Sequence, residues 1–132
     1  MGNWIPGDPT LVAQILKISS AYSPPPPEGF ISPMTWGIVD DVVARFVAAG
    51  VPEGNISCTR DTFVFNAPGP PSELLSLLRT YYGPTMNAFD AAAANGREAE
   101  LRAELDALFT SQNTSADATA IPATFLRVTV SV

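Results

Sequence analysis

The chain has 132 residues, the usual length of one domain, since domain sizes peak at about 100–150 residues. Its composition is 46% hydrophobic and only 15% charged, which indicates a packed core and argues against a disordered chain. Thirteen acidic and seven basic residues give a net charge of -6, which disfavours contact with nucleic-acid phosphates. Histidine is absent and Cys58 is the single cysteine. These counts exclude His-based triads, His-metal sites and an internal disulfide.

No apolar run reaches the roughly 18 residues that a membrane helix needs. The first residues also lack the basic and apolar regions of a signal peptide. We therefore expect a cytoplasmic protein whose partners include neither a membrane nor nucleic acid.

The first elements along the chain are a short strand and a helix. Residues 2–5 are predicted to form a strand that ends at Pro6. Asp8 followed by Pro9 is typical of a helix start, with Asp8 as the N-terminal cap. Apolar residues at helical spacing then predict a helix that continues to about Ala21.

A proline tract separates this helix from the next one. Pro24–Pro27 excludes a helix or a central strand and indicates an extended segment. The residues between the tract and Gly37 are predicted to form a lid-like loop. A second helix is expected over 38–49, with Gly50 ending it.

The next apolar segment, from Ile56 to Phe65, is predicted to be a strand because it is rich in β-branched and aromatic residues. Its apolar residues change parity near Arg60 and Asp61, which favours a bulge or a bend there. Ser72 is expected to cap a following helix.

Two breaks are expected in the remaining helical region, at Gly83-Pro84 and at Asn95-Gly96, the latter within a helical stretch over 85–109. A polar linker over 111–120 is expected next. The alternating residues 125–132 predict a final, half-buried strand.

Several strings of residues resemble one lineage of the class I S-adenosylmethionine-dependent methyltransferases and together cover almost the whole chain. They are Gly2-Asn3-Trp4-Ile5-Pro6, Pro24–Pro27, Ser32-Pro33-Met34-Thr35-Trp36-Gly37, Tyr81-Tyr82-Gly83-Pro84-Thr85-Met86-Asn87-Ala88-Phe89 and Ile121-Pro122-Ala123-Thr124-Phe125-Leu126-Arg127-Val128.

The resemblance implies an α/β fold in one domain over 1–132, similar to the C-terminal, substrate-side half of such an enzyme. It predicts a partial, mixed Rossmann-like sheet of three strands, with several helices and a lid-like insertion. The last strand is expected to lie antiparallel between the other two. The first four strands of the family, and its glycine-rich cofactor loop, have no counterpart in these residues. The chain alone is therefore expected to bind no cofactor, and S-adenosylmethionine only when a partner completes it.

The resemblance also implies an apolar substrate pocket. Its expected lining residues are Trp4, Met34, Trp36, Tyr81, Tyr82 and Met86. The alternative for each of them is a place in the core or under the lid. No residue is singled out as catalytic, and no metal ligands are expected. Cys58 is expected to be a buried structural thiol, because no histidine is present to activate it.

Two functions remain open at this point. The first is a methyltransferase-like subunit that shapes the substrate pocket and becomes catalytic when another chain or a second copy completes it. The second is a stand-alone homo-oligomer without methylating activity, either a module that binds an apolar ligand or a cofactor-free cyclase or isomerase. In both cases we expect a dimer or a complex, because the first strand lacks the neighbour that it has in the resembled family.

Overall fold

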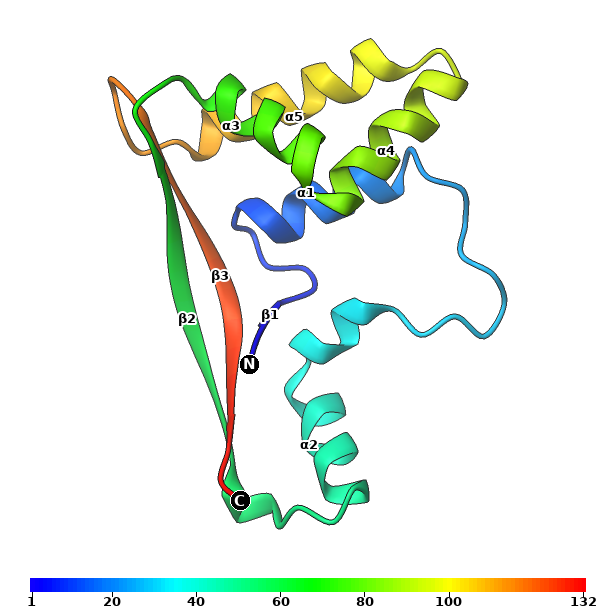
Figure 1. Ribbon diagram of the computed structural model, residues 1–132, viewed down its shortest axis with the longest axis vertical. Helices are drawn as coiled ribbons and strands as arrows, with labels where there is room; N and C mark the ends of the chain where they lie inside the picture. Colours follow the sequence, from blue (N-terminus) through cyan, green and yellow to red (C-terminus); the bar gives the residue numbers. More distant parts are fainter.

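The computed structural model describes all 132 residues and shows an α/β fold, with five α-helices beside a three-stranded sheet (Figure 1). The strands are β1 (Gly2–Trp4), β2 (Ile56–Ala67) and β3 (Thr119–Val130). The helices are α1 (Leu11–Ser20), α2 (Val39–Ala48), α3 (Pro71–Tyr81), α4 (Gly83–Ala94) and α5 (Glu98–Gln112), with a short 3-10 helix, η1 (Pro33–Gly37), before α2. None of the helices is both long enough and apolar enough to cross a membrane.

The sheet has the order β1-β3-β2. Strand β3 runs antiparallel to both neighbours, so β1 and β2 point in the same direction and no two adjacent strands are parallel. The expectation that the last strand lies antiparallel between the other two is therefore confirmed, but the sheet is antiparallel and not mixed, because β3 separates the two strands that share a direction. The outer edges of β1 and β2 pair with no other strand.

The two ends of the sheet bury opposite faces. Near one end, Ile121 and Ala123 of β3 belong to the main core, which α1, α3, α4 and α5 cover (Figure 1). Near the other end, Leu126 and Val128 join Val42 of α2 in a smaller core. Residues of opposite parity point to opposite faces of a strand, so β3 changes its buried face along its length.

The register of β2 on β3 is unbroken from Ile56, opposite Val130, to Ala67, opposite Thr119. Of the two alternatives expected near Arg60 and Asp61, a bulge is therefore excluded. The apolar residues change parity because helices cover one face at one end of the sheet and the other face at the other end.

Three element boundaries differ from the sequence-based expectation. Helix α1 begins at Leu11 rather than after Asp8, because the Asp8 carboxylate accepts the Thr10 backbone N–H at 2.9 Å and closes a turn. Helix α3 begins at Pro71, so Ser72 lies inside its first turn and does not cap it. Strand β3 begins at Thr119, within the expected linker, and not at residue 125.

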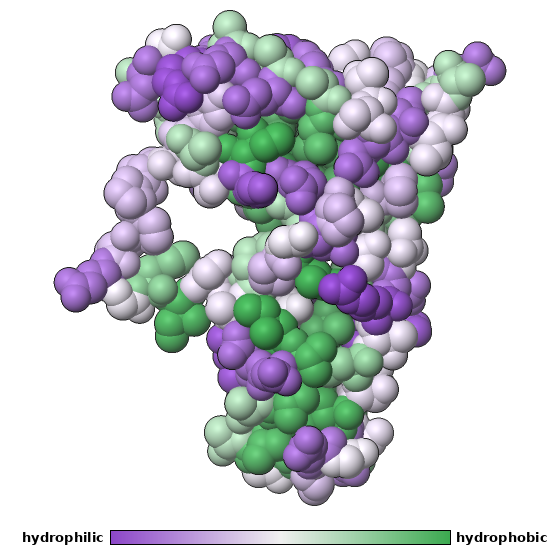
Figure 2. Space-filling view, turned by 180° about the vertical axis from the view of Figure 1, so that it is seen from behind, coloured by the Kyte–Doolittle hydropathy of each residue, from purple (hydrophilic) through white to green (hydrophobic).

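The connection between α1 and α2 extends outward from the rest of the molecule (Figure 1). The space-filling view shows an open gap between this loop and the body of the protein (Figure 2). Phe30 and Ile31 on the loop are exposed, with 53% and 73% of their surface accessible. The segment expected to be a lid-like loop is therefore an exposed loop, separated from the body of the protein by this gap.

Tyr22 follows α1 and is buried, and the guanidinium of Arg97 lies 4.3 Å from the centre of its ring. Burial raises the pKa of the Tyr22 phenol to about 12, and the negative charges of Glu100 and Glu104 act in the same direction.

We predict that Tyr22 destabilises the protein at alkaline pH. The unfolded chain releases the phenolic proton near the ordinary pKa of 10.0, whereas the folded chain holds it to about 12. This contribution to stability is complete below pH 10 and is lost as the pH rises to 12. The Tyr22→Phe variant should lose less stability than the wild type between these values in urea unfolding. The Tyr81→Phe variant, altered at a residue with 80% exposure, should follow the wild type. Equal alkaline losses in all three proteins would contradict the prediction.

Candidate functional site

A pocket of about 450 Å³ opens along β1. One wall comes from the end of α1, another from η1 and the residue before it, and a third from the junction of α3 and α4. Its lining residues are Gly2, Asn3, Trp4, Leu16, Ser20, Ser32, Pro33, Met34, Tyr82 and Pro84.

The structure brings three of the six expected site residues together in this pocket. Trp4 comes from β1, Met34 from η1 and Tyr82 from the junction between α3 and α4. All three side chains are half-buried. The Trp4 ring is held edge-on against Phe125 of β3, with 6.2 Å between the ring centres. The pocket therefore gathers segments that lie about 80 residues apart along the chain.

The other three expected residues lie elsewhere. Trp36 packs edge-on against Phe46 at 6.2 Å between ring centres, and the Arg45 guanidinium lies 4.5 Å from the centre of its ring. It therefore belongs to the small core under α2. Tyr81, at the end of α3, is 80% exposed, and Met86 on α4 is 39% exposed. Neither of them lines the pocket.

No charged side chain lines the pocket. The amide nitrogen of Asn3 is buried without a hydrogen-bond partner, and its side chain lies on the face of β1 that it shares with Leu126, opposite Trp4. Burial raises the pKa of the Tyr82 phenol, and a hydrogen bond with the Trp4 side chain lowers it in part. The phenol of Tyr82 is therefore neutral at physiological pH. The site offers hydrogen-bond donors and aromatic surface, but no group that would transfer a proton near pH 7.

Sequence reasoning missed Asn3 and Leu16 as pocket residues. Leu16 shares the helical spacing of the core residues of α1 and carries no other signal. Asn3 did carry a signal, because it is a polar residue inside an apolar strand. In the structure its partner on β3 is the buried Leu126. Such a residue in a strand indicates a site or an edge.

The outer edge of β1 adjoins the same pocket. Met1 and Val128 exchange two backbone hydrogen bonds, of 2.7 and 2.8 Å. Since hydrogen-bonded pairs alternate along an antiparallel ladder, the N–H and C=O groups of Gly2 and Trp4 point away from β3. No strand pairs with them. A second apolar pocket, of about 430 Å³, lies across one face of the sheet from β1 to β2 and is lined by Gly2, Asn3, Trp4, Phe63, Phe65 and Phe125.

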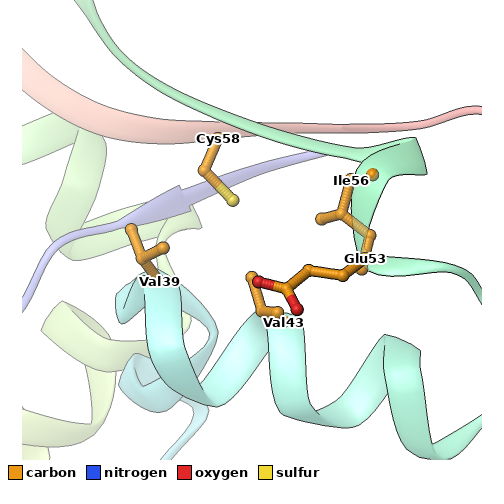
Figure 3. Close-up of a pocket in the computed structure, with 6 residues that line it drawn as sticks. Val39, Val43, Glu53, Ile56 and Cys58 are labelled. Atoms are coloured by element: carbon orange, nitrogen blue, oxygen red, sulfur yellow. The ribbon is translucent and has the colours of Figure 1, made fainter.

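A third pocket, of about 560 Å³, separates α2 from β2 (Figure 3). Cys58 points from β2 toward Val39 and Val43 on α2, and the Glu53 carboxylate lies beside Val43 (Figure 3). Cys58 is therefore half-buried at the wall of a pocket, and the expectation of a fully buried thiol is wrong. The reason is that α2 does not close against β2 at this point. Hydrophobic side chains also gather on the surface of this end of the molecule (Figure 2).

Neither a metal nor S-adenosylmethionine fits the residues at hand. No three His, Cys, Asp or Glu side chains gather in a group that could hold a metal ion. The pocket of about 450 Å³ that contains Trp4, Met34 and Tyr82 has no acidic residue to hold a ribose. No glycine-rich turn follows β1. Comparison of the chain with protein families, curated proteins and solved structures gives no match.

We predict that Gly37 fixes η1 against β1, and with it one wall of the pocket. A Cβ atom at Gly37 would lie 1.9 Å from the Trp4 carbonyl oxygen and 3.1 Å from Cα of Ile5, and neither backbone atom can rotate away. The Gly37→Ala variant should therefore lose about 1–3 kcal/mol of unfolding free energy, as overpacked sites do. At Gly54 an added Cβ meets nothing within 4 Å, so Gly54→Ala is the matched control. Urea denaturation that shows equal stability for the two variants would contradict this placement of η1.

Proposed function

We propose that this chain is the substrate-side half of a class I S-adenosylmethionine-dependent methyltransferase. It becomes catalytic when another chain supplies the remaining strands and the cofactor loop. The first support is the set of strings from Gly2 to Val128 that resemble this family and cover almost the whole chain.

The observation that carries the proposal is the strand order. The last strand of the chain, β3, inserts between β1 and β2 and runs antiparallel to both. The family pattern implies this arrangement for its fifth, seventh and sixth strands. Sequential strands are adjacent in most sheets, so an order in which the last strand enters the middle is a specific feature.

The open edge of β1 supports the need for a partner. Gly2 and Trp4 direct their backbone N–H and C=O groups to a side on which no strand lies. Gly37 of η1 packs against the Trp4 carbonyl oxygen, so the part of this edge that is free to accept a strand from another chain is at Gly2. Two apolar pockets include Gly2, Asn3 and Trp4, one beside the edge and the other across the face of the sheet from β1 to β2.

Uncovered apolar residues on α2 and just before it agree with the same view. Ile38, Val39 and Val47 expose 39%, 45% and 45% of their surface. Exposed apolar surface that gathers in a patch on a small protein commonly marks an interface. A partner that widens the sheet beyond β1 would also offer apolar surface on which α2 could pack.

The role of this chain in such an enzyme is to hold and orient the substrate. The cofactor, bound by the partner, supplies the methyl group. The half described here offers aromatic walls, an exposed loop and hydrogen-bond donors, and no general base in the pocket. Positioning of two reactants is sufficient to account for a large part of such a rate enhancement.

One observation favours a second function. The pocket that contains Trp4, Met34 and Tyr82 is formed by a single copy of this chain. A stand-alone homo-oligomer that binds an apolar molecule, or converts it as a cofactor-free cyclase or isomerase, would need nothing further to form that pocket.

We predict that S-adenosylmethionine binding requires a completed sheet. Isothermal titration of the purified chain alone should show no binding, because it lacks the glycine-rich loop. Addition of the N-terminal half of a methyltransferase of the resembled lineage should give a complex by sedimentation, with micromolar affinity for the cofactor. The stand-alone function would instead give a homomer that never binds the cofactor in any such mixture, and that result would overturn the methyltransferase proposal.

The edge of β1 can be tested in the same assay. The Gly2→Pro variant removes an outward-facing N–H and should weaken complex formation at least about tenfold, since proline blocks pairing at that position. The matched change on the other edge of the sheet is Val64→Pro, at an exposed residue of β2 whose N–H also points away from β3. This variant should form the complex as the wild type does, and circular dichroism should show both variants folded. Equal weakening by the two changes would contradict docking at β1.

A further inference from the structure

Strand β2 forms the other open edge of the sheet and contains 12 residues, against 3 in β1. It runs along one side of the molecule, and the α-helices lie toward the other side (Figure 1). The strand is rich in β-branched and aromatic residues, which are enriched in strands because they pack on a half-buried sheet surface. None of its residues is buried, however, whereas 5 residues of β3 are. One copy of the chain therefore leaves the strand-forming side chains of β2 without a full cover.

The backbone groups of this edge alternate in direction. Val128 of β3 exchanges its backbone hydrogen bonds with Met1, at 2.7 and 2.8 Å, so it forms none with Cys58, its partner on β2. Every second residue from Cys58 therefore directs its N–H and C=O groups outward, at positions 58, 60, 62, 64 and 66. No strand pairs with them, and the Val64 carbonyl accepts only the Asn66 side chain, at 3.2 Å. Another extended strand is the partner that supplies acceptors and donors in the same alternation.

Nothing on this edge blocks such pairing. Natural edges are protected by lysine, proline or a bulge, and β2 has none of these. Its only two charges are compensated within the chain, since the Arg60 guanidinium lies 3.7 Å from the Asp8 carboxylate and the Asp61 carboxylate lies 3.5 Å from the Arg127 guanidinium. A neighbouring strand would therefore meet no uncompensated charge.

We propose that β2 pairs antiparallel with β2 of a second copy of this chain, around a two-fold axis that passes through Phe63 and is perpendicular to the sheet. The two sheets then form one sheet of the order β1-β3-β2-β2-β3-β1. Phe63 is 53% exposed, and its ring contacts Phe65 edge-on, with 4.9 Å between the ring centres. It lies opposite Phe63 of the second copy, at a pair without hydrogen bonds, where facing side chains are closest. Aromatic pairs at such positions stabilise a sheet.

The side chains of the edge determine both the register and the partner. With the axis at Phe63, Thr62 lies opposite Val64 of the second copy, and about nine residues of each strand pair through about eight backbone hydrogen bonds. An axis at Arg60 or Asp61 would place two like charges directly opposite each other, which destabilises a sheet. In the register at Phe63 the edge is complementary to itself, and the two-fold axis repeats each favourable contact.

This dimer goes beyond the proposed function and does not depend on it. The methyltransferase partner docks at β1, on the opposite side of the sheet, so both contacts can be made at once. The dimer also affects a pocket. Phe63 lines the apolar pocket of about 430 Å³, and its counterpart in the second copy would extend that wall.

The first test compares the full chain with two variants at Val64 by sedimentation equilibrium, at concentrations up to the millimolar range. The wild type should form a reversible dimer. Val64→Pro should raise the dissociation constant at least about tenfold, because the two-fold axis removes an outward N–H from both copies. Val64→Thr keeps this N–H and the β-branched shape, so it is the matched control and should dimerise as the wild type does. Circular dichroism should show all three proteins folded.

An exchange of charges tests the register. Phe63→Lys and Phe63→Glu should each be monomeric, because the axis places two like charges opposite each other. Their equimolar mixture should form a heterodimer that salt weakens. Thr59→Lys and Thr59→Glu are the controls, at another exposed residue on the same face of β2. Each of them should form the homodimer, because Thr59 lies opposite Ala67 of the second copy and far from its own counterpart.

Three results would overturn the proposal. They are a monomer at every concentration, a dimer that Val64→Pro leaves intact, and a mixture of the two Phe63 variants that stays monomeric. A dimer that is lost in Gly2→Pro and retained in Val64→Pro would assign the interface to β1 and would overturn it as well. If Val64→Pro does not fold, the Phe63 variants decide. Neither the cofactor nor the N-terminal half is present, so these outcomes are independent of the reconstitution experiment above.

Discussion

Pairing of β3 with both other strands is the constraint on which the rest of the structure depends. This strand alone is hydrogen-bonded to β1 and to β2, and it supplies apolar residues to the helix layer on each face. Its partner residues on β1 are more than 120 positions away in the sequence. The sheet therefore forms only through contacts of long sequence separation, which are slow to form and costly in chain entropy.

A small polar cluster ties the first turn of the chain to this central strand. The Asp8 carboxylate is buried, accepts the Thr10 N–H and lies 3.7 Å from the Arg60 guanidinium on β2. The Thr10 hydroxyl oxygen in turn accepts the Thr124 N–H of β3 at 2.8 Å. The connection from β1 to α1 is thus fixed to both long strands. Trp4 and Leu16, which flank this connection, are placed relative to each other in the pocket wall as a result.

The pocket and the open edge are two aspects of one feature. A strand of three residues has β3 on one side and η1 packed beside Trp4, and nothing pairs with the remaining backbone groups. The same short strand carries the unpartnered Asn3 nitrogen. In the proposed enzyme a partner strand and the substrate would therefore meet at β1, where the substrate-side half ends and the cofactor half begins.

The sequence by itself determined the elements whose signals are local. The helix at α2 and its end at Gly50, with φ near +92°, follow from apolar spacing and from glycine's freedom to adopt that conformation. The two helix breaks and the strand at Ile56 were likewise predictable from residues close together in the chain. The placement of the last strand followed from the resemblance and not from periodicity. Of the expected site residues, Trp4, Met34 and Tyr82 were found to share a pocket.

Only the tertiary structure decided the remainder, because it depends on what lies next to each residue in space. Pro122 argues against a strand in sequence terms, yet it lies inside β3 opposite Val64. It is tolerated because its nitrogen points away from β2, to the side on which β1 has already ended, as the neighbouring N–H groups of Ala120 and Thr124 show by bonding to side chains. The apolar residues of β2 likewise change parity without a local cause. The change depends on which face of the sheet each group of helices covers. Trp36 and Tyr81 resemble pocket residues in the sequence, but packing against Phe46 and exposure at the end of α3 remove them from the pocket.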